Sequence, residues 1–377
     1  MSAEDQTRLD ERLRRAAWDN DVAEARRLIR RGADVNAKDD TEQNAYLIAT
    51  SEGYLRLLEL TLDHGARVNE KDGFNGTGII RAAERGHWDI VGRLVGAGVP
   101  VDHVNNLGWT GLHEAIILGN GDQTYLDTVR VLVAAGADVE LPSARDGVTP
   151  LRHARQQGFD RIGSLVQRAT DVPARKRRDP SADDRLLRAA TAGDADAASL
   201  ALRAGARLEA RDERRRTPLL LAVTEDNVEV ARLLVALGAD PDALDDQHDT
   251  PWLVTGVTGS VAMLEALLPA RPDLTIRNRY GGVSVIPASE RGHVAYVRRV
   301  VRTGIDVNHV NDLGWTALLE AVILGDGSQP YQQIVRTLLD AGADPAIADN
   351  DGVSALQHAE SKGQQDVARI LREAPGT

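Results

Sequence analysis

Two matched sets of side chains could carry acid–base chemistry. Each set combines a histidine, a tryptophan and a glutamate, and the sets are His103, Trp109 and Glu114, and, 206 residues later, His309, Trp315 and Glu320. A histidine beside a carboxylate can act as a general base with an orienting partner, and an indole can supply a flat binding surface. The alternative function for this sequence is therefore a small-molecule-binding protein or an acid–base enzyme with one such site in each half.

Structural roles account for the same residues more simply. The histidines can satisfy backbone groups between neighbouring loops, the glutamates can bind loop amides, and the tryptophans can brace a turn. No phosphate-binding glycine loop, zinc-binding His-Glu pattern or nucleophile elbow is present, and the chain has no cysteine. The Asp-Gly loops at 119–125 and 325–331 lack the ligand set of a calcium site. We therefore expect a protein that is not an enzyme, with no cofactor and no metal.

The composition limits the class of protein. The 377 residues are 42% apolar and 27% charged, carry a formal net charge of −12, and contain only 3% aromatic residues. No apolar run approaches the roughly 20 residues that cross a bilayer, and the N-terminus has no apolar signal segment. An acidic chain is a poor partner for nucleic acid. We expect a cytoplasmic protein with an aliphatic core, with no membrane and no nucleic acid among its partners.

A repeated glycine organises the whole chain. Each member follows a short segment with apolar residues at helical spacing, where a left-handed residue would end a helix, and most members are 33 or 38 residues apart: Gly32, Gly65, Gly98, Gly136, Gly205, Gly238, Gly304 and Gly342. Arg271 takes the glycine position that falls between Gly238 and Gly304. About a dozen residues after these positions comes a Thr-Pro-Leu motif or its relic, and the Thr-Pro pairs at 149–150, 217–218 and 250–251 predict the start of another helix.

This pattern resembles the ankyrin-repeat family, whose 33-residue unit carries a Thr-Pro-Leu-His-x-Ala motif. The resemblance implies an all-α ankyrin-repeat solenoid of helix-loop-helix units joined by β-hairpin loops. We count about eleven units: 9–38, 39–71, 72–104, 105–144, 145–170, 184–211, 212–244, 245–277, 278–310, 311–348 and 349–373. Arg215 and His248 stand where the hairpin usually has glycine, so irregular hairpins are expected there.

A longer repetition indicates a tandem duplication. Residues 100–138 align with 306–344 at an offset of 206, with 24 of 39 positions identical. We predict a block of five repeats over 1–170, an exposed linker over 171–183, and a block of six repeats over 184–377. The segment His-Val-Asn-x-Leu-Gly-Trp-Thr, followed by a long loop between the helices, resembles a bacterial subgroup of the family.

The family resemblance implies a protein–protein interaction scaffold that binds partners through a concave groove and its hairpin tips. The two blocks share a set of residues at these positions, and two similar patches would allow bivalent binding. The predicted partner-binding residues are Phe74, Leu107, Trp109 and Glu114 in the first block and Tyr280, Leu313, Trp315 and Glu320 in the second. The partner is expected to be a protein whose identity the sequence does not give, and a small-molecule ligand is the second possibility.

Overall fold

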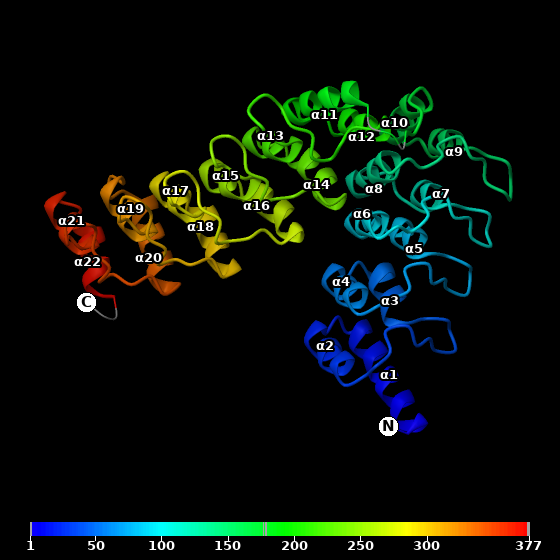
Figure 1. Ribbon diagram of the computed structural model, residues 1–377, viewed down its shortest axis with the longest axis horizontal. Coiled ribbons are helices and arrows are strands. Elements are labelled where there is room, and N and C mark those ends of the chain that lie inside the picture. The colour runs from blue at the N-terminus through cyan, green and yellow to red at the C-terminus, as the bar shows by residue number, and fades with distance from the viewer. Residues whose placement is uncertain (1, 176, 178, 375–377) are drawn as a thin grey trace. The chain divides into compact units, whose positions relative to one another are not determined.

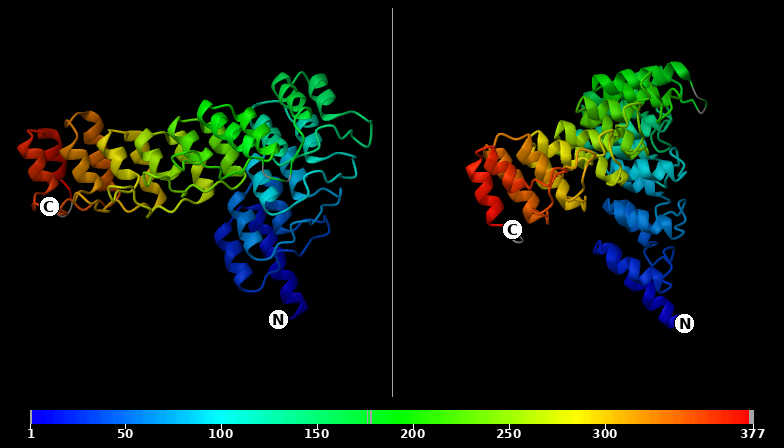
Figure 2. Two further views of the ribbon diagram at one scale, coloured as in Figure 1. Left: turned by 45° about the horizontal axis from the view of Figure 1, so that its top comes forward. Right: turned by 60° about the vertical axis from the view of Figure 1, so that its left-hand side comes forward.

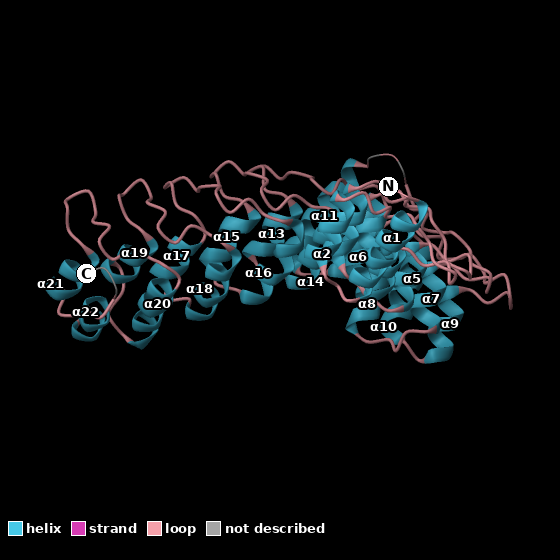
Figure 3. Cartoon of the chain, turned by 90° about the horizontal axis from the view of Figure 1, so that it is seen from below, coloured by secondary structure: helices cyan, strands magenta, loops and turns pink. Residues whose placement is uncertain are grey.

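The protein folds as a series of helix pairs (Figure 1). The computed structural model describes residues 2–175, 177 and 179–374, so Lys176 and Arg178 of the predicted linker and residues 375–377 lie outside the described residues. Within this part of the chain there are helices and loops and no strand (Figure 3), which confirms the all-α class.

The helices of the first half are α1 (Ala3–Trp18), α2 (Val22–Arg30), α3 (Ala45–Glu52), α4 (Leu55–Asp63), α5 (Gly78–Glu84), α6 (Trp88–Gly96), α7 (Gly111–Ile117), α8 (Gln123–Ala134), α9 (Pro150–Gln157) and α10 (Asp160–Thr170). The remaining α-helices are α11 (Pro180–Ala192), α12 (Ala195–Arg203), α13 (Pro218–Thr224), α14 (Val228–Ala236), α15 (Pro251–Thr258), α16 (Val261–Leu267), α17 (Val285–Glu290), α18 (Val294–Val300), α19 (Ala317–Ile323), α20 (Gln329–Asp340), α21 (Ala355–Ser361) and α22 (Gln365–Arg372). Short 3-10 helices, η1 (Leu268–Ala270) and η2 (Val301–Thr303), follow α16 and α18.

The predicted start and stop signals define the helix ends. The side-chain oxygen of Thr217 accepts a hydrogen bond from the backbone N–H of Leu220, and Pro218 occupies the first turn of α13. The repeated glycines that follow these helices have left-handed backbones, as at Gly238 with φ 93°. Arg271, at the glycine position, adopts φ 54°. The turn geometry is therefore kept even where the residue type is less suited to it.

The chain divides into two compact units. Unit 1 comprises 1–189, 194–210 and 232–239, and unit 2 comprises 190–193, 211–231 and 240–377. In unit 1 the inner helices α1, α3, α5, α7 and α9 pack in succession, and so do the outer helices α2, α4, α6, α8 and α10. In unit 2, α13, α15, α17, α19 and α21 form the inner layer, and α16, α18, α20 and α22 form the outer layer (Figure 2).

Within unit 1, the outer helix α12 packs against α8. The Arg130 guanidinium lies 2.7 Å from the Asp196 carboxylate, and the Ser199 hydroxyl donates to the Arg130 carbonyl oxygen over 2.8 Å. The helix α11 begins at Pro180, inside the segment assigned to the linker. The division into 1–170, 171–183 and 184–377 stays a prediction from the repeat pattern.

Each hairpin loop is closed by one acceptor side chain at its start. The Asp72 Oδ1 atom accepts from the backbone N–H groups of Phe74, at 2.9 Å, and Gly76, at 2.7 Å. Successive hairpins are joined by single backbone bonds, such as the 2.9 Å bond from the Asn106 N–H to the Phe74 carbonyl oxygen. Among the described residues the only isolated β-bridge is the antiparallel pair Lys71 and Thr77. The hairpins are tight turns without strand ladders.

The hairpins at Arg215 and His248 are regular, so the expectation of irregularity was wrong. His248 adopts φ 61°, and the Asp245 N–H still donates to the Asp249 carbonyl oxygen over 3.0 Å. The neighbouring bonds hold His248 in a conformation that costs a residue with a Cβ atom roughly 1 kcal/mol.

Replacing His248 with glycine is expected to raise the free energy of unfolding by about 0.5–1 kcal/mol, because glycine adopts this conformation without the Cβ clash while its larger unfolded-state entropy offsets part of the gain. Urea denaturation followed by circular dichroism measures this change. A His248→Ala variant, which keeps the Cβ atom, is the control and should show no gain. An equal gain in both variants would contradict the backbone explanation.

The inserted loops in the fourth repeat of each block contact the preceding repeat. The Tyr125 hydroxyl of α8 donates to the Glu84 carbonyl oxygen at the end of α5 over 3.0 Å, and Tyr331 makes the matching 2.9 Å bond to Glu290. Each tyrosine therefore joins an outer helix to the inner helix of the preceding repeat.

Candidate interaction surface

Large apolar side chains lie exposed on the predicted hairpins. Phe74 is 63% exposed in unit 1, and Tyr280, its matched residue in unit 2, is 55% exposed. Leu313 is 52% exposed, whereas its match Leu107 is half-buried. Three of these side chains are thus largely in solvent, where a partner could cover them.

The tryptophans do not lie at the hairpin tips. Trp109 is half-buried, its indole Nε1 atom is buried, and its carbonyl oxygen accepts from the Asn105 N–H over 3.0 Å where the hairpin closes. Trp315 is half-buried at the same position, with a 3.0 Å bond from the Asn311 N–H. Both indoles therefore border the hairpin base, with part of the ring available to a partner.

A buried amide–carboxylate contact ties each of these hairpins to its inner helix. The Asn105 Nδ2 atom donates to Glu114 Oε1 over 2.7 Å, while Asn105 Oδ1 accepts from the N–H groups of Leu107 and Trp109, both at 3.0 Å. In unit 2, Asn311 donates to Glu320 over 2.9 Å and accepts from the same two positions of its hairpin. The asparagine thus closes the turn and binds one oxygen of the carboxyl group, while Glu114 Oε2 is buried without a hydrogen-bond partner.

Burial changes the proton affinity of these two carboxyl groups. Glu114 is 3% exposed and Glu320 is 5% exposed. Burial raises the pKa of each to about 7, opposed by the hydrogen bond from the asparagine. Both groups therefore bind or release a proton near neutral pH, although neither is open to solvent.

The histidines of the proposed acid–base sets contact backbone carbonyl oxygens. The Nε2 atom of His103 lies 2.8 Å from the Asn75 carbonyl oxygen, and that of His309 lies 2.6 Å from the Gly281 carbonyl oxygen, each in the preceding hairpin. Among the hydrogen bonds and ion pairs of the described residues, none joins His103 to Glu114 or His309 to Glu320. The structure places each histidine on a backbone group and each glutamate on an asparagine, and it shows no assembled acid–base pair.

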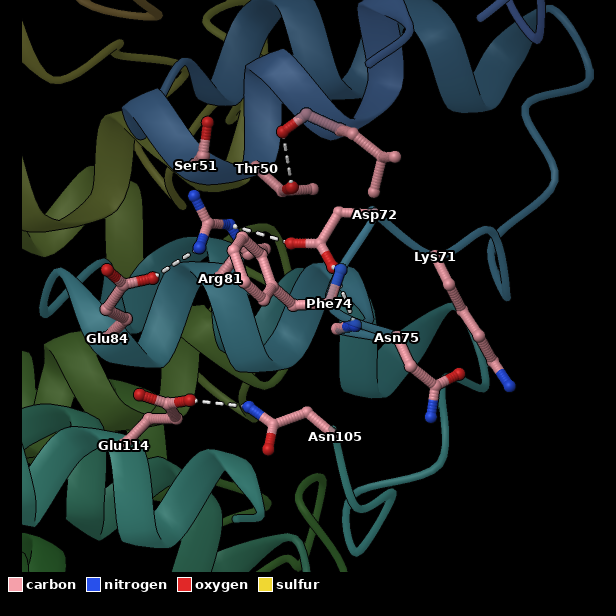
Figure 4. A network of polar contacts seen from close by, with 12 residues as sticks. Thr50, Ser51, Lys71, Asp72, Phe74, Asn75, Arg81, Glu84, Asn105 and Glu114 are labelled. Carbon is pink, nitrogen blue, oxygen red and sulfur yellow. Dashed lines mark hydrogen bonds and ion pairs between the residues drawn. The ribbon is translucent and has the colours of Figure 1, made fainter. Parts of the chain in front are cut away.

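The third repeat of the first block carries a network of ion pairs (Figure 4). The Arg81 guanidinium lies 3.3 Å from the Asp72 carboxylate and 2.7 Å from the Glu84 carboxylate. In the same repeat, Arg85 reaches back to Glu52, with 2.5 Å between Nη1 and Oε1. The charges on this part of the inner layer of unit 1 are thus paired within the chain.

Unit 2 contains a cavity of about 330 Å³ against three hairpins and the inner helices α13, α15 and α17. Its charged lining consists of four arginines and three acids, namely Arg214, Arg216, Arg279, Arg291, Asp245, Asp249 and Glu290. The Arg279 guanidinium lies 4.9 Å from the centre of the Tyr280 ring, so the two side chains form one platform at the edge of the cavity. Of the residues predicted for binding, Tyr280 alone lines this cavity.

The sequence interpretation missed Asn105, Asn311 and the arginines of the cavity. The asparagines lie in the matched segments His-Val-Asn at 103–105 and 309–311, so their retention in both blocks was a usable signal. Arg291 is matched in the first block by Arg85, whereas Arg279 gave no such signal, because the first block has a glycine, Gly73, at the matched position.

Comparison with known proteins defines the family. The family model described as ankyrin repeats (3 copies) matches residues 79–176, 186–278 and 285–377. These segments cover more than half of the chain, and the protein therefore belongs to the ankyrin-repeat family. Ankyrin repeats generally mediate protein–protein interaction, and the family is typically non-enzymatic.

Several relatives share parts of the chain. The putative ankyrin repeat protein YahD of Escherichia coli is 42% identical over 112 residues, which are 29% of this chain and 56% of that protein. The human mitochondrial disaggregase is 36% identical over 80 residues, 21% of this chain and 10% of that protein. The matched segments thus span little more than half of the first relative and a small part of the second. A solved ankyrin repeat domain from Acinetobacter baumannii AYE, 45% identical, covers 50% of this chain and 96% of its own length with a TM-score of 0.49.

Two further properties concern the described part of the chain. No helix there combines the length and the apolar character needed to cross a bilayer. Its histidine, aspartate and glutamate side chains form no group of three or more arranged to hold a metal ion.

Proposed function

We propose that this protein is a non-enzymatic interaction scaffold that binds protein partners through its hairpin tips and inner helices. The observation that carries the proposal is the retention of exposed apolar side chains on matched hairpins. Phe74 and Tyr280 occupy the same hairpin position 206 residues apart, and both are more than half exposed. Exposed aromatic side chains cost solubility in a free protein and contribute large contact areas in a complex.

The buried Asn–Glu contacts support the same function. Each one fixes the fourth hairpin of its block, which carries the predicted Leu and Trp residues, to the inner helix that follows, so that these residues are held on a rigid turn. A preorganised surface loses little conformational entropy on binding. One such patch in each block, centred on Trp109 and Trp315, would let the chain hold a repeated or oligomeric partner at two points.

The double variant Phe74→Ala/Tyr280→Ala is expected to unfold at the wild-type temperature and to bind a protein partner more weakly by on the order of 2 kcal/mol per occupied site. Partners are captured from a bacterial lysate on the immobilised chain and identified, and their affinities are then measured by calorimetry. Trp109→Ala/Trp315→Ala should also weaken binding, because the half-buried rings border the same patches.

Leu118 and Leu324 offer a matched control. These residues also correspond between the blocks and are 49% and 48% exposed, but they lie at the far ends of the inner helices α7 and α19. Leu118→Ala/Leu324→Ala should leave binding unchanged. If the control pair weakens binding as much as the hairpin pair, or if Trp109→Ala/Trp315→Ala merely unfolds the chain, the assignment of these hairpins fails.

A further inference from the structure

The two blocks differ at the positions that neutralise charge in the third repeat. Three residues of the first block supply the counter-charges described above: Asp72, Arg81 and Glu52. The matched positions in the second block, 206 residues later, are Asn278, Pro287 and Thr258, none of which carries a charge. The second block therefore lacks the ion pairs that the first block forms in this repeat.

The second block keeps charged residues at the positions of Glu84 and Arg85, the ion-pair partners in the first block. Glu290 matches Glu84 and Arg291 matches Arg85, and both line the cavity of unit 2. Among the described residues, neither side chain makes a hydrogen bond or ion pair, and the same is true of Arg214 on the hairpin before α13. Arg216 and Arg279, in contrast, are paired with Asp212 and with Asp249.

The cavity also has an apolar side and a definite extent. Its apolar lining includes Leu220, Val254, Val257 and Pro287, and Val257 is 38% exposed. Arg214 precedes α13 and Arg291 follows α17, so the two free arginines are separated by two helix spacings, roughly 16–20 Å, and by the length of one inner helix, about 10 Å. An extended chain covers the combined distance with about six or seven residues.

We propose that this cavity binds an extended peptide segment of a partner protein, in which an aspartate or glutamate pairs with Arg291 or Arg214 and a neighbouring apolar side chain covers Val254, Val257 and Pro287. The proposal rests on the protein-binding function above and names the chemistry of one of its sites. Four arginines face three acids here, whereas the whole chain carries −12. This small local excess suits a single carboxylate and not a polyanion such as nucleic acid.

The experiment uses the full-length chain and a phage-displayed library of random twelve-residue peptides. Selected peptides are expected to share an acidic residue within a few positions of an apolar one. Fluorescence anisotropy with a labelled selected peptide then measures affinity. Arg291→Gln should weaken binding about tenfold, because a hydrogen bond to a charged group is lost. Replacing the peptide's acidic residue with its amide should have an equal effect, and the two changes together should cost little more than either one.

Two matched variants sharpen the test. Arg85→Gln removes the corresponding arginine of the first block, which is already paired with Glu52, and should leave peptide affinity unchanged. Thr258→Glu restores in the second block the acid that the first block has at position 52. It should weaken peptide binding while Arg291 is intact, because the new carboxylate competes for the guanidinium.

The outcomes separate this inference from the proposed function. Selected peptides without an acidic residue, equal losses in Arg291→Gln and Arg85→Gln, or tighter binding of a short single-stranded DNA would overturn the inference. If the peptides lose affinity on Tyr280→Ala but not on Arg291→Gln, the scaffold function stands and the acidic recognition fails. If no peptide is enriched and no protein is captured from lysate, both fail.

Discussion

Glu114→Gln and Glu320→Gln are each expected to stabilise the protein by on the order of 2 kcal/mol at pH 8 and to change its stability little at pH 4.5. Burial raises the pKa of both carboxyl groups from 4.5 to about 7 in the folded protein. The folded state therefore holds protons that the unfolded state has released. Each pKa unit corresponds to 1.36 kcal/mol, and structural relaxation reduces the full difference.

The sign follows from proton linkage. Between pH 4.5 and 7 the folded chain binds more protons than the unfolded chain, so stability is fully present below pH 4.5 and falls as pH rises through 7. His113 acts in the opposite direction, since burial lowers its pKa to about 4 and its contribution is lost as pH falls. The pH dependence of the free energy of unfolding of the wild type contains both contributions. The difference between wild type and each glutamine variant isolates the carboxyl group.

Urea midpoints at pH 4.5, 6, 7 and 8 provide the measurement. Neighbouring charges should modulate the two sites differently: Glu84, Arg81 and Asp72 act on Glu114, whereas Glu290 raises the pKa of Glu320. A stabilisation that is independent of pH would show that the carboxyl groups are already ionised in the folded protein.

Gly256→Ala is expected to lower the free energy of unfolding of unit 2 by about 3 kcal/mol. Gly256 lies in α15, and a Cβ atom there would come within 2.0 Å of the Ser284 carbonyl oxygen at the start of α17. Because a backbone atom cannot rotate away, the two inner helices would have to separate. In the first block, Thr50 stands at the position of Gly256 and Gly78 at the position of Ser284. The side chain at this contact therefore belongs to α3 in the first block and to the start of α17 in the second.

Gly163→Ala is the matched control for this prediction. Gly163 is also a buried helical glycine, in α10, but its added Cβ would meet only the Ala154 Cβ atom at 3.9 Å. Alanine favours the helix by up to about 1 kcal/mol over glycine, so this variant should gain stability. Thermal unfolding of both variants, followed by circular dichroism, makes the comparison. Similar losses at both positions would contradict the steric explanation.

The repeat architecture was predictable because its signals are local. A glycine that ends a helix, a threonine that begins one and a 33-residue period specify the helix pairs without any knowledge of distant contacts. The hairpins at Arg215 and His248 were misjudged because residue preference was weighed above the side-chain acceptor that closes each turn. Asp212 and Asp245 hold those turns as Asp72 holds its own.

The surface was predictable only in part. Matched positions drew attention to Phe74 and Tyr280, whose role in binding stays a prediction, and to the two glutamates. Asn105, the hydrogen-bond partner of Glu114, is nine residues away and resembles an ordinary turn asparagine in the sequence. The cavity in unit 2 could not be inferred from matched residues alone, since Glu290 and Arg291 are matched but their ion-pair partners in the first block are not. The ion pairs of Arg81 and Arg85 in the first block show which contacts are missing at Pro287 and Thr258 in the second.

The tyrosine contacts of the inserted loops affect how the solenoid opens. Repeat arrays fray from their ends and open in steps of about one repeat, because each repeat touches only its neighbours. Tyr331 bonds α20 to the backbone of Glu290, the residue whose side chain lines the cavity. We therefore expect the third and fourth repeats of the second block to open together. A segment bound in the cavity would slow amide hydrogen exchange in α20, a helix that contributes no residue to the cavity wall.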